Sequence, residues 1–357
     1  MFATDTLSFA GSGAVLAVAA ALSATPAPAG AAKPQRATLS CAASGTLEAL
    51  VDCISHQMPQ HDSNGFAVPT AAQSTDFAAV VTSMLEGNCD FALPASIGAN
   101  MAIRSFTDDG NGRTYCLLME VKSSVKSGFV DKGWGTFITH PAGARRISHH
   151  APHPKFDTAS TGSDEGDAYS AREAVRIFKR SDSRSYLMAG TRRSANLSAS
   201  TCQGSYWQSD CAHNTANMYF PANVALDNFY AARGQDWTAI EWHSKSASTC
   251  SNDVFMSMGR NETPPAGSKL QLLKAAMEAQ KPSWVIETTG GGGTCALVAS
   301  TNTAGRMLNG VTATNACGTA ATSASGKFLH IEQTTGLVGD LEATSTAWAN
   351  ALIAAFP

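Results

Sequence analysis

The sequence predicts an α/β fold, with a mixed central sheet that carries helices on both faces and a small N-terminal accessory region. Over residues 126–357, short apolar runs of strand length alternate with amphipathic runs of helix length, a pattern typical of a sheet covered on both faces. The chain has 357 residues, 44% of them hydrophobic and 15% charged, so it can bury one large core. Residues 33–125 are expected to form the accessory region, because they gather no catalytic residue types.

Apolar residues that recur at three- and four-residue steps mark the helices, and short runs rich in branched and aromatic residues mark the strands. The helices are expected at residues 46–54, 76–87, 171–178 and 270–280. The strands are expected at residues 114–121, 136–139, 144–148, 185–190, 237–242, 283–288 and 328–332. Asp164, Glu165 and Asp167 lie just ahead of the third helix, where the helix dipole favours negative charge.

Charge and hydropathy argue against two classes of partner. A net charge of −3 without a dense Lys/Arg run argues against nucleic acid and against an anionic membrane surface. Residues 7–25 are apolar and precede small residues and prolines, so residues 1–32 are expected to be a secretory signal peptide or, alternatively, a disordered leader. No later apolar run reaches the roughly 20 residues that span a bilayer. We therefore expect a secreted, extracellular protein with no membrane partner.

Nine cysteines support export, since disulfides persist in oxidising compartments. Proximity along the chain suggests four disulfides with Cys250 left over, although spacing alone does not fix connectivity. The suggested pairs are Cys41/Cys53, Cys89/Cys116, Cys202/Cys211 and Cys295/Cys317. The sequence has no Cys-x-x-Cys, which argues against a zinc knuckle or a thioredoxin-type site. Asn196 and Asn261 begin glycosylation sequons.

Metal-capable side chains gather in residues 145–157, between an expected strand and an expected helix. His149, His150, His153 and Asp157 fall within nine residues there. His149 and His150 are adjacent, so on a strand they point to opposite faces and at most one of them faces a metal. Sites in α/β sheets usually lie at strand ends, so this segment is the first place to seek a metal site.

Two distant strand ends carry His243 and Glu332. Zinc hydrolysis needs about three protein ligands, an open position for water, and a carboxylate that takes the proton of the water. His153, Asp157 and His243 are the expected zinc ligands, and Glu332 is the expected general base. A plain surface pair between Glu332 and His330, which shares its strand face, is the competing account.

Three short motifs resemble those of zinc carboxypeptidases and of the related N-formylglutamate amidohydrolases. Residues 240–244, Ile-Glu-Trp-His-Ser, look like the strand-end His-Ser that supplies their third zinc ligand. Residues 152–154, Pro-His-Pro, are similar to a Pro-His segment of the amidohydrolases, and residues 328–333 to the strand of their general-base glutamate. The resemblance covers roughly residues 133–357 and implies a zinc exopeptidase architecture.

One departure from this pattern leaves the ligand set open. The His-x-x-Glu pair of the carboxypeptidases is absent, because His153 stands three positions after His150 and the nearest downstream acid is Asp157. Either Asp157 replaces the glutamate, or His150, His153 and His243 form a three-histidine site that would also suit copper. Asp157 could also simply cap a turn.

Polar residues in three loops are candidates for substrate contact. Arg192 and Arg193 follow a strand end and could hold a substrate carboxylate through a bidentate pair, a role that the resemblance also implies. A surface salt bridge is the alternative for either arginine. The remaining candidates are Asp210, His213, Asn214, Arg306 and Asn309.

The sequence thus predicts a secreted zinc-dependent hydrolase of amide bonds, acting on a small-molecule or peptide substrate that carries a carboxylate. Peptides, N-acyl amino acids and polyglutamate all meet this description. Two alternatives use the same residues: a non-catalytic protein that binds a metal or ligand, and a copper-dependent redox enzyme. Serine hydrolase and P-loop chemistry are disfavoured, because the sequence lacks Gly-x-Ser-x-Gly and a Gly-rich loop ending in Lys-Ser/Thr.

Overall fold

The computed structural model describes residues 41–121, 130–155, 166–291, 293 and 295–357. These residues belong to one compact unit. The expected leader at residues 1–32 lies outside the described residues and stays a prediction. In the described part of the chain, no helix combines the length and the apolar character needed to cross a membrane.

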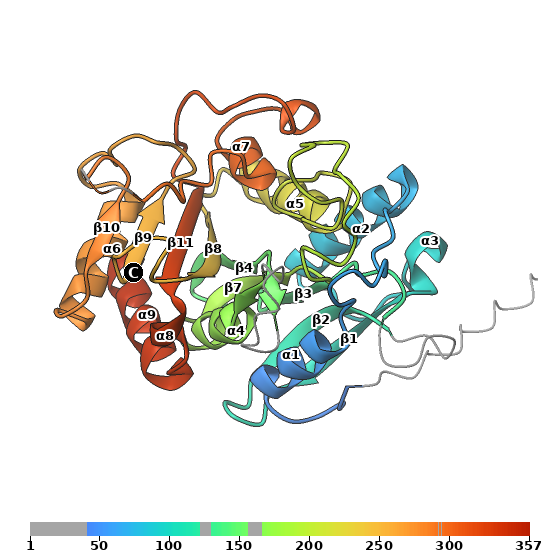
Figure 1. Ribbon diagram of the computed structural model, residues 1–357. Helices are drawn as coiled ribbons and strands as arrows, with labels where there is room; N and C mark the ends of the chain where they lie inside the picture. Colours follow the sequence, from blue (N-terminus) through green and yellow to red (C-terminus); the bar gives the residue numbers. More distant parts are fainter. Residues whose placement is uncertain (1–40, 122–129, 156–165, 292, 294) are drawn as a thin grey trace, which may run out of the picture. The chain divides into compact units, whose positions relative to one another are not determined.

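A nine-stranded mixed sheet forms the centre of the fold, in the order β1-β2-β3-β7-β4-β8-β11-β9-β10, and a second sheet pairs β5 with β6 (Figure 1). The strands are β1 Met101–Thr107, β2 Thr114–Glu120, β3 Thr136–Thr139, β4 Arg145–Ala151, β5 Pro154–Lys155, β6 Asp167–Ala168, β7 Ser183–Met188, β8 Thr238–Lys245, β9 Val254–Ser257, β10 Ile286–Thr288 and β11 Phe328–Thr334. Four neighbouring strands of this sheet are parallel: β7, β4, β8 and β11. The pairs β1–β2, β2–β3, β3–β7 and β9–β11 are antiparallel. The predicted α/β class with a mixed sheet is confirmed.

Helices cover both faces of this sheet (Figure 1). They are α1 Leu47–His56, α2 Ala71–Leu85, α3 Ala95–Gly98, α4 Ser170–Arg180, α5 Tyr219–Ala231, α6 Lys269–Gln280, α7 Thr303–Leu308, α8 Thr335–Val338 and α9 Leu341–Ala355, with a 3-10 turn at Ala313–Asn315. α1, α4, α6 and α9 share one hydrophobic core with the sheet, and α2, α5 and α7 share the other. Each face of the sheet therefore has its own buried layer.

The N-terminal part of the described chain joins this sheet. β2 pairs with β3 from Cys116 opposite Thr139 to Met119 opposite Thr136, and β1 forms the sheet edge beyond β2. The main sheet thus runs across residue 126, where the sequence pattern changes. α1 and α2 cover opposite faces of the sheet at this end.

Two long helices have no clear apolar period in the sequence. α5 carries Pro221 in its first turn, where the missing backbone N–H of proline is tolerated. α9 is rich in alanine and threonine, so few large apolar residues mark its buried face, although Trp348 and Leu352 are fully buried there. Both helices form because their faces pack against the sheet and its neighbouring helices, which a local pattern does not report.

Four disulfides are present, and two of the expected pairs are wrong. The bonds join Cys41 to Cys53, Cys89 to Cys116, Cys202 to Cys317 and Cys250 to Cys295. The first two pairs agree with the expectation, but Cys202/Cys211 and Cys295/Cys317 do not form and Cys250 is not left over. The two corrected bonds span 115 and 45 residues, because they join loops that only the fold brings together. The unpaired cysteine is the buried Cys211.

A buried hydrogen-bonded chain crosses the core between α9, β11 and α4. The indole Nε1 of Trp348 donates to Gln333 Oε1 at 2.6 Å, and Gln333 Nε2 donates to Glu173 Oε2 at 2.5 Å. Glu173 is fully buried, and its Oε1 has no hydrogen-bond partner among the described residues. Burial raises the pKa of Glu173 to about 8, which Gln333 only partly offsets, so this carboxyl group is neutral at pH 7.

We predict that Glu173→Gln removes a pH dependence of stability. The folded protein keeps this proton up to a pKa of about 8, whereas the unfolded chain releases it near the usual glutamate pKa of 4.5. The free energy of unfolding should therefore fall as pH rises between these values, by on the order of 1 kcal/mol per pH unit. Urea unfolding from pH 5 to 9 should show a flatter profile for the variant.

The half-exposed Glu278 provides the matched control, since Glu278→Gln makes the same chemical change outside the core. The control should keep the wild-type slope. A wild-type slope in Glu173→Gln as well would mean that Glu173 is ionised in the folded protein.

Candidate metal centre

Two neighbouring parallel strands place two histidines and two glutamates on one face of the sheet. β8 and β11 pair with His243 opposite Glu332 and Glu241 opposite His330. Because side chains alternate between the faces of a strand, these four residues share the face covered by α5 and α7. The residues between them on each strand belong to the core of the other face. All four are buried, and we call them the His/Glu block.

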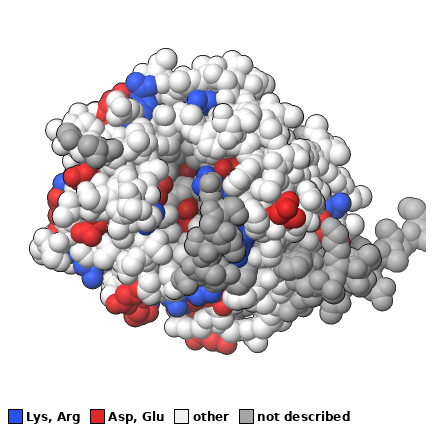
Figure 2. Space-filling model, viewed as in Figure 1, with Lys and Arg blue, Asp and Glu red and all other residues white. Residues whose placement is uncertain are grey.

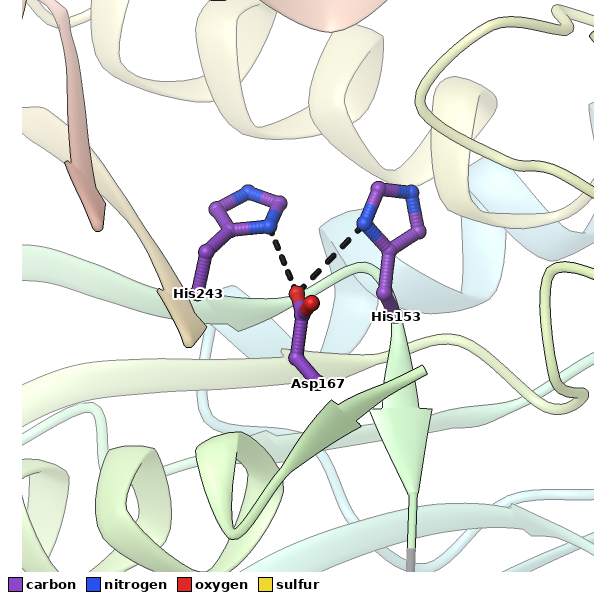
Figure 3. Close-up of side chains that lie close together, drawn as sticks. All are labelled: His153, Asp167 and His243. Atoms are coloured by element: carbon purple, nitrogen blue, oxygen red, sulfur yellow. Dashed lines mark hydrogen bonds and ion pairs between the residues drawn. The ribbon is translucent and has the colours of Figure 1, made fainter. Parts of the chain in front are cut away.

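The small second sheet brings Asp167 to the same place. β5 and β6 pair with Pro154 opposite Asp167, and the backbone N–H of Asp167 donates to the carbonyl oxygen of His153 at 2.8 Å. The Asp167 carboxylate lies 2.7 Å from Nδ1 of His243 and 3.5 Å from Nδ1 of His153 (Figure 3). Backbone pairing therefore sets where this carboxylate stands relative to the two imidazoles.

His153, Asp167 and His243 have the chemistry and spacing of a divalent-cation site. Their donor atoms all lie within 4.8 Å of one another, and all three residues are buried. Two ligands of one tetrahedral zinc ion lie roughly 3.4 Å apart, close to the 3.5 Å between His153 Nδ1 and Asp167. That Nδ1 atom has no hydrogen-bond partner among the described residues, so its lone pair is available to a cation.

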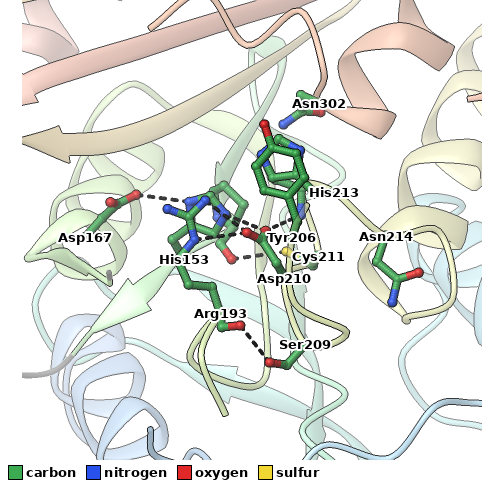
Figure 4. Close-up of polar contacts among 12 residues, drawn as sticks. His153, Asp167, Arg193, Tyr206, Ser209, Asp210, Cys211, His213, Asn214 and Asn302 are labelled. Carbon is green, nitrogen blue, oxygen red and sulfur yellow. Dashed lines mark hydrogen bonds and ion pairs between the residues drawn. The ribbon is translucent and has the colours of Figure 1, made fainter. Parts of the chain in front are cut away.

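Asp210 orients His153 and selects its tautomer. Asp210 Oδ1 lies 2.9 Å from Nε2 of His153, and because a carboxylate only accepts, Nε2 carries the proton and Nδ1 keeps its lone pair. Arg193 pairs with the other Asp210 oxygen at 3.0 Å (Figure 4). Burial alone would raise the pKa of Asp210, but the positive charge of Arg193 and the hydrogen bond from His153 outweigh it and hold this pKa well below its usual range.

The centre concentrates buried negative charge. The buried carboxylates are Asp167, Asp210, Glu241 and Glu332. Glu241 is held by neutral donors, the Tyr219 hydroxyl at 2.9 Å and the Asn302 amide at 2.7 Å. Burial lowers the pKa of His243, but Asp167 outweighs burial and raises this pKa to about 10. A cation that binds His243 therefore displaces a proton, and it supplies the positive charge that buried carboxylates require.

Glu332, the general base expected from the sequence, lies beside this metal group. Donor atoms of Glu332, His243 and His330 lie within 4.8 Å of one another. His330 Nε2 lies 3.4 Å from Glu332 Oε1, so the competing His330/Glu332 pair also exists, but it is buried instead of exposed. Burial raises the pKa of Glu332 to about 7, which the charge of His243 only partly offsets.

His150 is not brought to the metal group. Its ring meets Tyr219 edge-on with centroids 5.6 Å apart, and its Nε2 lies 2.8 Å from the hydroxyl of Ser148. Burial lowers the pKa of His150 to about 3, so it is a neutral core residue. The expected three-histidine alternative of His150, His153 and His243 is therefore not assembled among the described residues.

Asp157, the acid expected to complete the ligand set, lies outside the described residues. Among the described residues, the carboxylate of Asp167 lies beside His153 and His243. In the sequence, Asp167 stands out only as negative charge ahead of α4. The pairing of β5 with β6 places the Asp167 carboxylate beside His153 and His243. Each of these strands has two residues, and strands that short leave no periodic pattern in the sequence.

The two arginines and the loop after them lie close to the centre. Arg193 joins it through Asp210, and Arg192 is buried, with its backbone N–H donating to the carbonyl oxygen of Pro59. His213 stacks on Tyr206 with ring centroids 3.4 Å apart (Figure 4). Burial lowers the pKa of His213 to about 3, so its ring is neutral.

The other candidates for substrate contact bind backbone instead. Asn214 donates to the carbonyl oxygen of Gln208, and Asn309 donates to that of Met258. The Arg306 guanidinium donates to the carbonyl oxygens of Ser300, Ala316 and Cys317. These side chains hold loops in place, and none of them belongs to the metal groups found among the described residues.

Comparisons with known proteins place the chain near no family. No protein-family model and no curated protein matches it. Among solved structures, gene product Atu2144 from Agrobacterium tumefaciens is similar at 11% identity and a TM-score of 0.36, covering 59% of this chain and 90% of its own. "A putative metallopeptidase" from Shewanella denitrificans OS217 is similar at 7% identity and a TM-score of 0.28, covering 79% of this chain and 87% of its own. The candidate centre is therefore defined by its own geometry.

We predict that Asp167→Asn weakens zinc binding by at least about 100-fold at one equivalent of metal, because the change removes an anionic donor next to two imidazoles. Competition with a zinc-chelating dye measures the loss. Asp157→Asn is the matched control, since it tests the acid expected from the sequence, and it should leave zinc affinity unchanged. Loss of zinc in Asp157→Asn, with normal binding in Asp167→Asn, would restore Asp157 to the ligand set.

Proposed function

We propose that this protein is a secreted, zinc-dependent hydrolase of amide bonds in substrates that carry a carboxylate, such as peptides, N-acyl amino acids or polyglutamate. The observation that carries the proposal is the convergence of His153, Asp167 and His243, from separate strands and loops, beside the buried carboxylate of Glu332. Two imidazoles and one carboxylate, with a second carboxylate nearby, are the residue types that zinc-assisted hydrolysis requires.

His153, Asp167 and His243 would hold the ion. When bound, zinc supplies a Lewis acid that polarises a carbonyl oxygen and acidifies water. Asp210 keeps the His153 proton on Nε2 and so leaves Nδ1 for coordination. Arg193 holds Asp210 ionised, because its guanidinium lies 3.0 Å from the carboxylate. The tautomer and orientation of His153 are thus set before any ligand arrives.

Glu332 is the proposed general base. Its carboxylate takes a proton from the attacking water and passes it to the leaving nitrogen. A pKa of about 7 suits both steps, because a base that is too acidic takes a proton poorly and one that is too basic returns it poorly. Only 8% of the Glu332 surface is exposed, so few waters compete for this carboxylate.

The arginines are the proposed partners of the substrate carboxylate. Arg193 pairs with Asp210 beside His153, and 18% of its side chain is exposed. A guanidinium binds carboxylates in a bidentate pair. Figure 2 shows acidic and basic side chains gathered inside a hollow on one face of the molecule.

The disulfides support the proposal that the protein is secreted. Four disulfides are compatible with an oxidising compartment, where such bonds persist. The leader expected at residues 1–32 would provide the route. The glycosylation sequons at Asn196 and Asn261 stay predictions.

We predict that Glu332→Gln lowers kcat for an N-acyl amino acid by at least about 100-fold, because the amide that replaces the carboxylate cannot take a proton. Zinc should still bind at the first equivalent, since the three ligands are unchanged. Hydrolysis is followed by release of the free amine over a panel of N-acyl amino acids and their amide-capped counterparts. Glu278→Gln should behave as wild type. Unchanged turnover in Glu332→Gln would remove this residue as the base, and absence of any amide turnover in the wild type would overturn the proposed function.

A further inference from the structure

The His/Glu block contains more metal-capable donors than one cation uses. The exposed fraction of these residues is 0% for Glu241, 4% for His243, 4% for His330 and 8% for Glu332. Only His243 among them belongs to the group with His153 and Asp167. Its ring centroid lies 4.5 Å from that of His330. A second set of donors within 4.8 Å of one another, from His243, His330 and Glu332, therefore stands directly beside the first.

The polar atoms of this second set are not satisfied within the protein. His330 Nδ1 and His243 Nε2 are buried and have no hydrogen-bond partner among the described residues. The nearest carboxylate oxygens lie 3.4 Å from His330 Nε2, at Glu332, and 3.5 Å from His243 Nε2, at Glu241. Two buried ring nitrogens without hydrogen-bond partners, beside two buried carboxylates, are groups that a bound cation would satisfy.

The two nitrogens of His243 face different residues. Nδ1 lies 2.7 Å from Asp167, so it serves the first group, and Nε2 lies on the side of Glu241. One imidazole nitrogen binds one cation, so a second cation would have to use Nε2. His243 would then release both ring protons to solvent and bridge the two cations as an imidazolate. His330 and Glu332 belong to the second group alone, whereas His153 and Asp167 belong to the first alone.

We propose that His330 and Glu332, with Nε2 of His243, form a second divalent-cation site, so that the protein binds two cations side by side. A donor set of two imidazoles and one carboxylate selects zinc, cobalt or a similar transition metal over calcium or magnesium, which prefer oxygen ligands. This second site goes beyond the proposed hydrolase function. A cation bound to Glu332 would occupy the carboxylate that acts as the general base of the hydrolase. Binding of the second cation should therefore oppose hydrolysis.

Equilibrium dialysis against zinc, and against cobalt as a spectroscopic probe, tests the second site. Wild-type protein should bind two equivalents. His330→Gln should bind one, with the affinity of the tighter wild-type site unchanged, and Asp167→Asn should also bind one, because it keeps the second group. His213→Gln is the matched control, since it replaces a buried histidine outside both groups, and it should bind two.

One equivalent in the wild type, or two equivalents in His330→Gln, would overturn the second site. Circular dichroism and thermal unfolding establish that each variant is folded, and His330→Asn replaces His330→Gln if the latter unfolds. Because the readout is stoichiometry, a failure here leaves the hydrolase proposal untouched. A failure of amide turnover likewise leaves the metal count untouched.

Discussion

The parallel pairing of β8 with β11 is the constraint on which the candidate centre depends. It sets His243 opposite Glu332 and turns both toward the same face of the sheet. A register shift of one residue would turn one strand's polar side chains into the hydrophobic core of the other face. The alternation of large apolar and polar residues on both strands opposes such a shift, because Trp242 and Ile331 must stay in that core.

The polar residues of the centre form one connected set. The set runs from Arg193 through Asp210, His153 and Asp167 to His243, each contact 3.5 Å or less. Burying so many charges opposes folding, since each ion loses its hydration and only good geometry repays the loss. Such a set is expected where function needs fixed charges, and a bound cation would relieve the excess of carboxylates.

Loops from distant parts of the chain hold this set in position. The segment that carries Asp210 is joined to the segment after α7 by the disulfide between Cys202 and Cys317. Arg306 secures the same junction, because its guanidinium donates to the carbonyl oxygen of Cys317. Arg306, which the sequence predicts to bind substrate, thus fixes the loop joined through Cys202 to the segment that carries Asp210. The carboxylate of Asp210 in turn orients His153. The contribution of Arg306 to the site is indirect.

The sequence alone determined the α/β class, the positions of the main strands, and the strand-end residues His243 and Glu332, because each depends on local periodicity along one strand. Tertiary structure decided what these residues meet. Asp167 lies beside His153 and His243 because two very short strands pair, His150 makes a core contact with Tyr219, and two disulfides join loops far apart in sequence. Such outcomes depend on distances between separate segments, and those distances exist only once the sheet has formed.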